Sequence, residues 1–210
     1  MKRTRVKICG ITRPEDGIAA ARAGADAIGL VFHSASARAV SIEQAVAIRC
    51  ALPPFVSVVA LLVNPEAPFV RNCIEAVSPD LLQFHGDEGP EFCGSFDHPW
   101  IKAIRVQHQG MVESARTTYE GASGILADAY SAHQYGGTGK TFNWDWLPVA
   151  SSDPLILAGG LTPDNVASAL RRVRPWAVDV SGGVESSPGI KSPALIEHFI
   201  QEVNQNHETD

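Results

Sequence analysis

LILAGGLTPDNV, residues 155–166, contains one complete strand–turn–helix unit. The run 155–160 is apolar and ends in two glycines, which is typical of a buried strand that leads into a tight turn. Thr162, Pro163 and Asp164 then mark a helix start, because threonine can cap a helix, proline suits its first turn and an acid favours its positive end. The stretch therefore predicts a β-strand followed at once by an α-helix.

The same unit recurs on both sides of this stretch. Apolar runs, each with a helical segment behind it, occupy residues 5–10, 27–32, 55–63, 81–86, 101–106, 124–130, 155–160 and 177–183. Thr12 is expected to cap the first helix. The other helices are expected to begin near Ser41, Asn64, Glu88, Trp144 and Ser192, and a weakly marked helix is expected after the fifth run. Strand–helix alternation favours an α/β fold, and eight units favour a closed (β/α)₈ TIM barrel. An open doubly wound sheet is the alternative if the weak fifth and sixth units are misread.

Composition limits the classes of function. The chain has 210 residues, which suits one domain over residues 1–210, with 204–210 expected to be a frayed polar tail. Lys and Arg number 17 against 23 Asp and Glu, so the net charge is -6 and nucleic acid is a poor partner. No apolar run reaches the ~18 residues of a membrane span, and no signal peptide is expected. Four cysteines without a CxxC pair predict free thiols in a reducing cytoplasm. A monomer and a homodimer both remain open.

Polar side chains stand where the predicted strands end, and a (β/α)₈ barrel carries its chemistry at those ends. These positions hold Cys9, His33, Arg38, Asn64, Gln83, His85, Arg105, Asp128 and Asp179. We therefore expect Gln83, His85 and Asp179 to face a substrate.

Glycines cluster at the ends of the last two strands. The pair Gly159-Gly160 ends the seventh strand, and Ser181, Gly182 and Gly183 end the eighth. Barrels often bind phosphate with these two loops, because glycine lets backbone N–H groups approach an anion. The pattern favours a phosphorylated small molecule as ligand, with tight turns alone as the alternative.

Cys9 and Asp128 are the candidate chemical pair. They end the first and sixth strands, which lie on roughly opposite sides of an eight-stranded ring, so their side chains can flank a substrate. Proton transfer near neutral pH requires the thiol as thiolate base and the carboxyl as protonated acid. Strand alternation is expected to turn Lys7 away from Cys9, which leaves the thiolate without a clear activator. A buried apolar thiol and a structural carboxylate are the alternatives for the two residues.

Two further sequence patterns are typical of ligand sites, one of phosphate-binding loops and one of metal sites. GGTGKT at 136–141 resembles a phosphate-binding P-loop, but Gln134 stands in place of its first glycine, so we reject nucleotide binding and expect a lid over the substrate. His33, His85, Asp128 and Asp179 are residue types that bind metals. They come from four strands without HxH or HxD spacing, so no metal is predicted.

Five motifs in a fixed order resemble the phosphoribosylanthranilate isomerase family of tryptophan biosynthesis. They are VKICGIT at 6–12, QFHGDE at 83–88, GGTGKTFNW at 136–144, LAGGLTPDNV at 157–166 and VDVSGGVESSPGIKS at 178–192, which together span nearly the whole chain. The resemblance implies a (β/α)₈ barrel that catalyses the Amadori rearrangement of N-(5-phosphoribosyl)anthranilate.

The resemblance also implies roles for individual residues. Cys9 would be the general base, Asp128 the general acid, and Arg38 would lie against the anthranilate group. The phosphate would be held by Gly159, Gly160, Ser181 and Gly182. No hydride or group carrier is needed, so no cofactor is implied. The rival hypotheses are a related phosphosugar isomerase or epimerase barrel and a barrel that binds a phosphorylated ligand without turnover.

Overall fold

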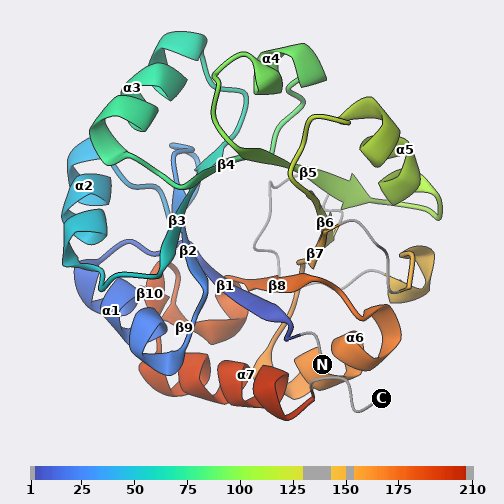
Figure 1. Ribbon diagram of the computed structural model, residues 1–210. Coiled ribbons are helices and arrows are strands. Elements are labelled where there is room, and N and C mark those ends of the chain that lie inside the picture. The colour runs from blue at the N-terminus through green and yellow to red at the C-terminus, as the bar shows by residue number, and fades with distance from the viewer. Residues whose placement is uncertain (1–2, 130–142, 150–153, 207–210) are drawn as a thin grey trace.

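The computed structural model describes residues 3–129, 143–149 and 154–206. The eight barrel strands pair in chain order, each parallel to the next, and the last strand closes the ring by pairing with the first. Figure 1 looks into this ring, with the helices around its outside. The barrel strands are β1 (Arg5–Cys9), β2 (Ala27–Val31), β3 (Ser57–Leu62), β4 (Leu81–Phe84), β5 (Trp100–Val106), β6 (Ile125–Ala129), β7 (Leu155–Leu157) and β8 (Ala177–Val180). The predicted barrel is confirmed, and closure of the ring excludes the open sheet.

Helices connect the strands and cover the barrel. They are α1 (Pro14–Ala23), α2 (Ile42–Ala51), α3 (Ala67–Val77), α4 (Pro90–Gly94), α5 (Met111–Thr118), α6 (Pro163–Val173) and α7 (Pro193–Gln205). Near the short helix predicted at Trp144, a 3₁₀ turn, η1 (Trp144–Trp146), is present. Across the described parts of the chain, every helix is too short or too polar to cross a membrane.

Alternate residues of each strand face opposite sides of the barrel wall. One set points into the barrel, where Ile101, Ala103, Leu126 and Ala158 form an apolar cluster. The other set packs against the helices and builds the larger core, which contains the fully buried rings of Phe84 and Phe199. The barrel interior is therefore apolar at this cluster, whereas Lys7 of β1 and Asp179 of β8 form a buried ion pair elsewhere in it.

One helix cap differs from the prediction. Thr12 does not cap α1, because its hydroxyl donates to the Gly189 carbonyl at 2.6 Å and Arg13 takes the cap position. The fourth helix begins at Pro90, close to the predicted start near Glu88, whose carboxylate is held by backbone N–H groups and a buried lysine.

The C-terminal tail is also shorter than expected. Asn204 and Gln205 belong to the last turn of α7, since Ile200 and Val203 are buried and anchor that turn to the core. Residues 207–210 lie outside the described part of the chain.

A small hairpin that the sequence analysis did not predict follows β8. The 3₁₀ turn η2 (Gly182–Val184) leads into the antiparallel strands β9 (Glu185–Ser187) and β10 (Ile190–Lys191). The Lys191 N–H donates to buried Asp16 of α1 at 3.0 Å, so the hairpin is fastened to the barrel. This attachment carries Glu185 and Lys191 to the mouth of the barrel.

Candidate active site

A cavity of about 240 Å³ opens at the carboxyl ends of the barrel strands. The predicted site residues that line it are Cys9, Arg38, His85, Asp128, Gly159, Gly160, Asp179, Ser181, Gly182 and Gly183. Gln83 does not reach this cavity and is completely buried. Residues spread over most of the sequence thus meet at one end of the barrel.

Cys9 and Asp128 enter this cavity from different parts of the ring. Cys9 is the last residue of β1, and Asp128 lies near the end of β6. Both side chains are almost fully buried, with 5% of Cys9 and 4% of Asp128 exposed. A ligand in the cavity would therefore meet both groups with little water around either.

A chain of three polar side chains fixes the carboxyl of Asp128. His85 Nε2 lies 3.1 Å from Asp128 Oδ2, and Gln83 Nε2 lies 3.0 Å from His85 Nδ1. With the Gln83 amide as donor to Nδ1, the ring hydrogen of neutral His85 sits on Nε2 and is donated to Asp128. Gln83, predicted to face the substrate, instead lies behind His85 and sets its orientation.

Cys9 has a basic neighbour on its own strand. Lys7 and Cys9 are two residues apart, and residues two apart on a strand share a face, so the expectation that Lys7 turns away was wrong. Burial raises the pKa of the Cys9 thiol above its ordinary value, and attraction to Lys7 is the largest effect in the opposite direction. Lys7 Nζ also donates to Asp179 Oδ1 at 2.8 Å.

Arg38 is held at the cavity by the hairpin. Its Nε and Nη2 donate to the two carboxylate oxygens of Glu185, each at 2.7 Å. Lys191 donates to the same carboxylate at 2.8 Å and to the Ser181 carbonyl at 3.2 Å. Burial alone would raise the pKa of Glu185, but the hydrogen bonds from Arg38 and Lys191 lower it below its ordinary value. Glu185 is therefore an anion that ties two cations to the site.

The glycines predicted to hold phosphate lie together. Gly159 and Gly160 have φ angles of 85° and 66°, which glycine adopts without strain. A methyl group on Gly183 would lie 1.9 Å from the Leu161 carbonyl oxygen, so the loops after β7 and β8 touch without room for a side chain. The N-terminus of α6 stands beside them, with Asn165 Oδ1 accepting the Thr162 N–H at 2.9 Å. Backbone and a helix end thus converge as an anion site requires.

Two sequence patterns remain, the His and Asp residues weighed as metal ligands and the glycine-rich segment expected to form a lid. Within residues 3–129, 143–149 and 154–206, no three His, Cys, Asp or Glu side chains are grouped as metal ligands would be. The lid expected at residues 136–141 falls outside the described residues.

Three residues at the site were missed or misjudged from sequence. Glu185 and Lys191 lie in the segment VESSPGIK, whose alternation is too short to mark a hairpin. Lys7 was set aside although its position two residues before Cys9 was sufficient to place it beside the thiol.

Comparisons with known proteins agree with one another. Residues 6–202 match the family described as N-(5'phosphoribosyl)anthranilate (PRA) isomerase. An N-(5'-phosphoribosyl)anthranilate isomerase of Pseudomonas fluorescens is 54% identical over 209 residues, which cover 100% of both chains.

Solved structures give the same result. Phosphoribosyl anthranilate isomerase from Thermotoga maritima matches with a TM-score of 0.88 and 41% identity, over 96% of this chain and 99% of the other. A second structure of such an isomerase holds reduced 1-(o-carboxyphenylamino)-1-deoxyribulose 5-phosphate. It matches with a TM-score of 0.82 and 37% identity, over 96% and 99% of the two chains.

Proposed function

Since the chain belongs to the N-(5'-phosphoribosyl)anthranilate isomerase family, we propose that Cys9 and Asp128 are the general base and general acid of its reaction. The enzyme catalyses the Amadori rearrangement of N-(5-phosphoribosyl)anthranilate to 1-(2-carboxyphenylamino)-1-deoxyribulose 5-phosphate in tryptophan biosynthesis. The observation that carries the proposal is the cavity itself, in which a thiol and a carboxyl from distant strands face one enclosed space.

Asp128 performs the first proton transfer. Its carboxyl gives a proton to the furanose ring oxygen, the bond from that oxygen to C1 breaks, and the anthranilate nitrogen forms a Schiff base with C1. The hydrogen bond from His85 aims the carboxyl and stabilises the carboxylate that remains.

Cys9 performs the second proton transfer. Its thiolate takes the proton from C2, and the electron pair of that bond forms the C1–C2 double bond of an enolamine. The enolamine then loses its hydroxyl proton and gains one at C1, which gives the ketose. Atoms balance without any hydride or group carrier, so the reaction itself calls for no cofactor.

Arg38 lies against the anthranilate end of the substrate. The guanidinium edge that carries Nε and Nη2 is engaged with Glu185, so a two-point clasp of the anthranilate carboxylate by that edge is blocked. Its flat face is suited to stacking on an aromatic ring. This geometry favours stacking of Arg38 on the anthranilate ring.

The phosphate of the substrate binds between Gly159-Gly160 and Ser181–Gly183. Replacing Gly160 by valine is expected to raise KM about tenfold or more, the scale of one lost hydrogen bond to a charged group, because φ of 66° strains a branched residue and the side chain displaces the anion. Steady-state kinetics measure this, and Gly94→Val is the control, since nothing lies within 4 Å of a methyl group there. An unchanged KM in Gly160→Val would place the phosphate elsewhere.

A metal requirement would distinguish the rival function, a phosphosugar epimerase, from the proposed isomerase. Consumption of phosphoribosylanthranilate, followed by the loss of its fluorescence, is expected to proceed at the same rate with and without a chelator. Loss of activity that added metal restores would contradict the proposal, and binding of the substrate without turnover would favour the non-enzymatic barrel.

Of the two assemblies left open, monomer and homodimer, we propose the homodimer, with Phe55 at its interface. Its ring is fully exposed, follows Pro53 and Pro54, and sits on a backbone with φ of 70°, which is costly for a non-glycine residue unless contacts compensate. Another Thermotoga maritima structure, 36% identical over 96% of this chain, is described as monomers generated from a dimeric phosphoribosylanthranilate isomerase, so a dimeric relative exists.

Replacing Phe55 by glutamate is expected to convert the dimer to monomers, because the interface would bury an unpaired charge. Sedimentation velocity measures the change. Val149→Glu is the control, since Val149 is the other strongly exposed hydrophobic residue of the described chain. A monomeric parent protein would contradict the assembly.

The protein acts in the cytoplasm. All four cysteines are free thiols, three of them buried, which fits a reducing compartment.

A further inference from the structure

The proposed reaction gives no role to the buried ion pair that lies at the reacting cavity. Lys7 of β1 and Asp179 of β8 are paired in the sheet register, and Lys7 Nζ donates to Asp179 Oδ1 at 2.8 Å. The two side chains are only 7% and 9% exposed, so both charges are removed from water inside the barrel. A buried ion pair in a barrel interior is costly and adds little stability over apolar residues of the same size. Its presence beneath the reacting cavity therefore indicates a function.

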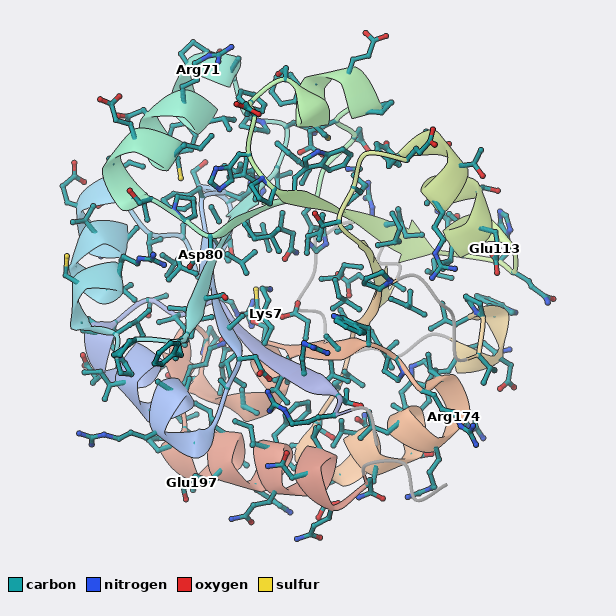
Figure 2. The ribbon with its side chains drawn as sticks, in the orientation of Figure 1. Lys7, Arg71, Asp80, Glu113, Arg174 and Glu197 are labelled. Atoms are coloured by element: carbon teal, nitrogen blue, oxygen red, sulfur yellow. The ribbon has the colours of Figure 1, made fainter. Side chains whose placement is uncertain are left out.

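The ammonium of Lys7 lies beside the Cys9 sulfur. A methyl group placed on Gly29 of β2 would lie 2.7 Å from Cys9 Sγ and 3.1 Å from Lys7 Cε, so the two side chains converge over this glycine. Figure 2 shows Lys7 at the inner side of β1, within the ring of strands. Hydrogen bonding and Coulomb attraction between Lys7 and Cys9 favour the ammonium and the thiolate together.

Other charges also act on the thiol, and Lys7 has the largest effect among them. Asp179 repels a thiolate, whereas Lys191 of the hairpin attracts it more weakly than Lys7 does. Arg38 faces the same sulfur across the cavity, where His33, His85 and Asp128 are the remaining ionisable side chains.

We propose that Lys7 is the positioning residue that stabilises the thiolate form of Cys9 for removal of the C2 proton, with Asp179 fixing the ammonium in place. The proposal rests on the role of Cys9 as general base. Asp179 orients the ammonium by accepting a hydrogen bond from Lys7 Nζ at 2.8 Å, and in its absence the Cys9 thiolate still attracts the ammonium. Lys7 thus supplies a local positive charge in a protein whose net charge is -6.

Two substitutions are expected to shift the Cys9 titration in opposite directions. Lys7→Met removes the attracting charge and should raise the thiol pKa, which lowers the thiolate fraction at neutral pH about tenfold or more. Asp179→Asn removes the repelling charge and should lower the thiol pKa. A purely structural ion pair predicts no such opposition, because loss of either partner would only destabilise the fold.

The titration is measured by the rate of alkylation with iodoacetamide against pH, in the unliganded enzyme. Cys50→Ser serves as the background, because Cys50 is the exposed cysteine. Burial raises the pKa of Cys73 and Cys93 to about 12 each, so neither competes for the reagent. The double variant Lys7→Met/Asp179→Asn leaves neither partner of the ion pair as an unpaired charge. The pH midpoint of its Cys9 alkylation should still lie above that of the Cys50→Ser background protein.

Lys102→Met is the matched control. Lys102 is also a buried lysine in an ion pair, with Glu88 at 2.8 Å, but it faces the helix side of the wall. The Lys102→Met variant should have a lower free energy of unfolding, and the pH midpoint of its Cys9 alkylation should be unchanged. In turnover assays Lys7→Met should lose kcat about tenfold or more at neutral pH and keep KM within about threefold.

The outcomes separate this inference from the proposed function. Midpoints that stay the same, or that move together in Lys7→Met and Asp179→Asn, would overturn the role of Lys7 while leaving Cys9 as base. Wild-type turnover in Cys9→Ala would instead overturn the base assignment on which the inference rests.

Discussion

Replacing Asp128 by asparagine is expected to lower kcat by about 10²-fold or more, the scale of a lost general acid. The asparagine amide keeps the size of the side chain and a polar contact to His85, but it has no proton to give to the ring oxygen. Ring opening becomes slow, whereas the phosphate and anthranilate contacts remain, so KM should change little. Steady-state kinetics with phosphoribosylanthranilate measure both constants.

Asp97→Asn is the control for this change. Asp97 is exposed, and its φ of 48° suits asparagine as well as aspartate. Its kcat should equal that of the parent enzyme. Turnover of Asp128→Asn within a few-fold of the parent would remove Asp128 from its role and direct attention to His85 as the acid.

Replacing Cys9 by alanine is expected to lower kcat by a similar factor of about 10² or more, because no other side chain at that position can take the C2 proton. The same role sets the pH dependence. A base acts only when deprotonated, and burial raises the pKa of the Cys9 thiol above its ordinary value, so the rate of Cys9 alkylation by iodoacetamide should rise as the pH is raised above neutrality.

Cys73→Ala provides the comparison, since it removes an equally buried thiol from α3, away from the cavity. It should lower the free energy of unfolding and leave kcat unchanged. A Cys9→Ala enzyme as fast as Cys73→Ala would show that Cys9 is only a packing residue.

The fold could be predicted from the sequence because each unit carries its own local signals. Parallel strands buried on both faces give apolar runs, and stops such as Gly24 and the Thr162-Pro163-Asp164 start mark helix ends between them. The count of eight runs then favoured a closed barrel. The cavity followed from the same logic, because strand ends of a closed barrel meet on one face.

The electrostatic environment of the site could not be predicted in the same way. The ion pair of Lys7 with Asp179 joins residues 172 positions apart and depends on which strand closes the ring. The Arg38–Glu185 pair depends on a hairpin whose strands have only three and two residues. Gln83 shows the opposite error, since its place near a strand end suggested contact with substrate while the side chain points to His85.

The most direct test of Cys9 as the base that removes the C2 proton uses substrate deuterated at C2. Nuclear magnetic resonance follows the label during incubation with the parent enzyme and with Cys9→Ala. The parent enzyme is expected to remove deuterium from C2 as product forms, whereas Cys9→Ala should retain the label at C2. Loss of the label in Cys9→Ala at the rate of the parent enzyme would contradict the assignment of Cys9 as the base.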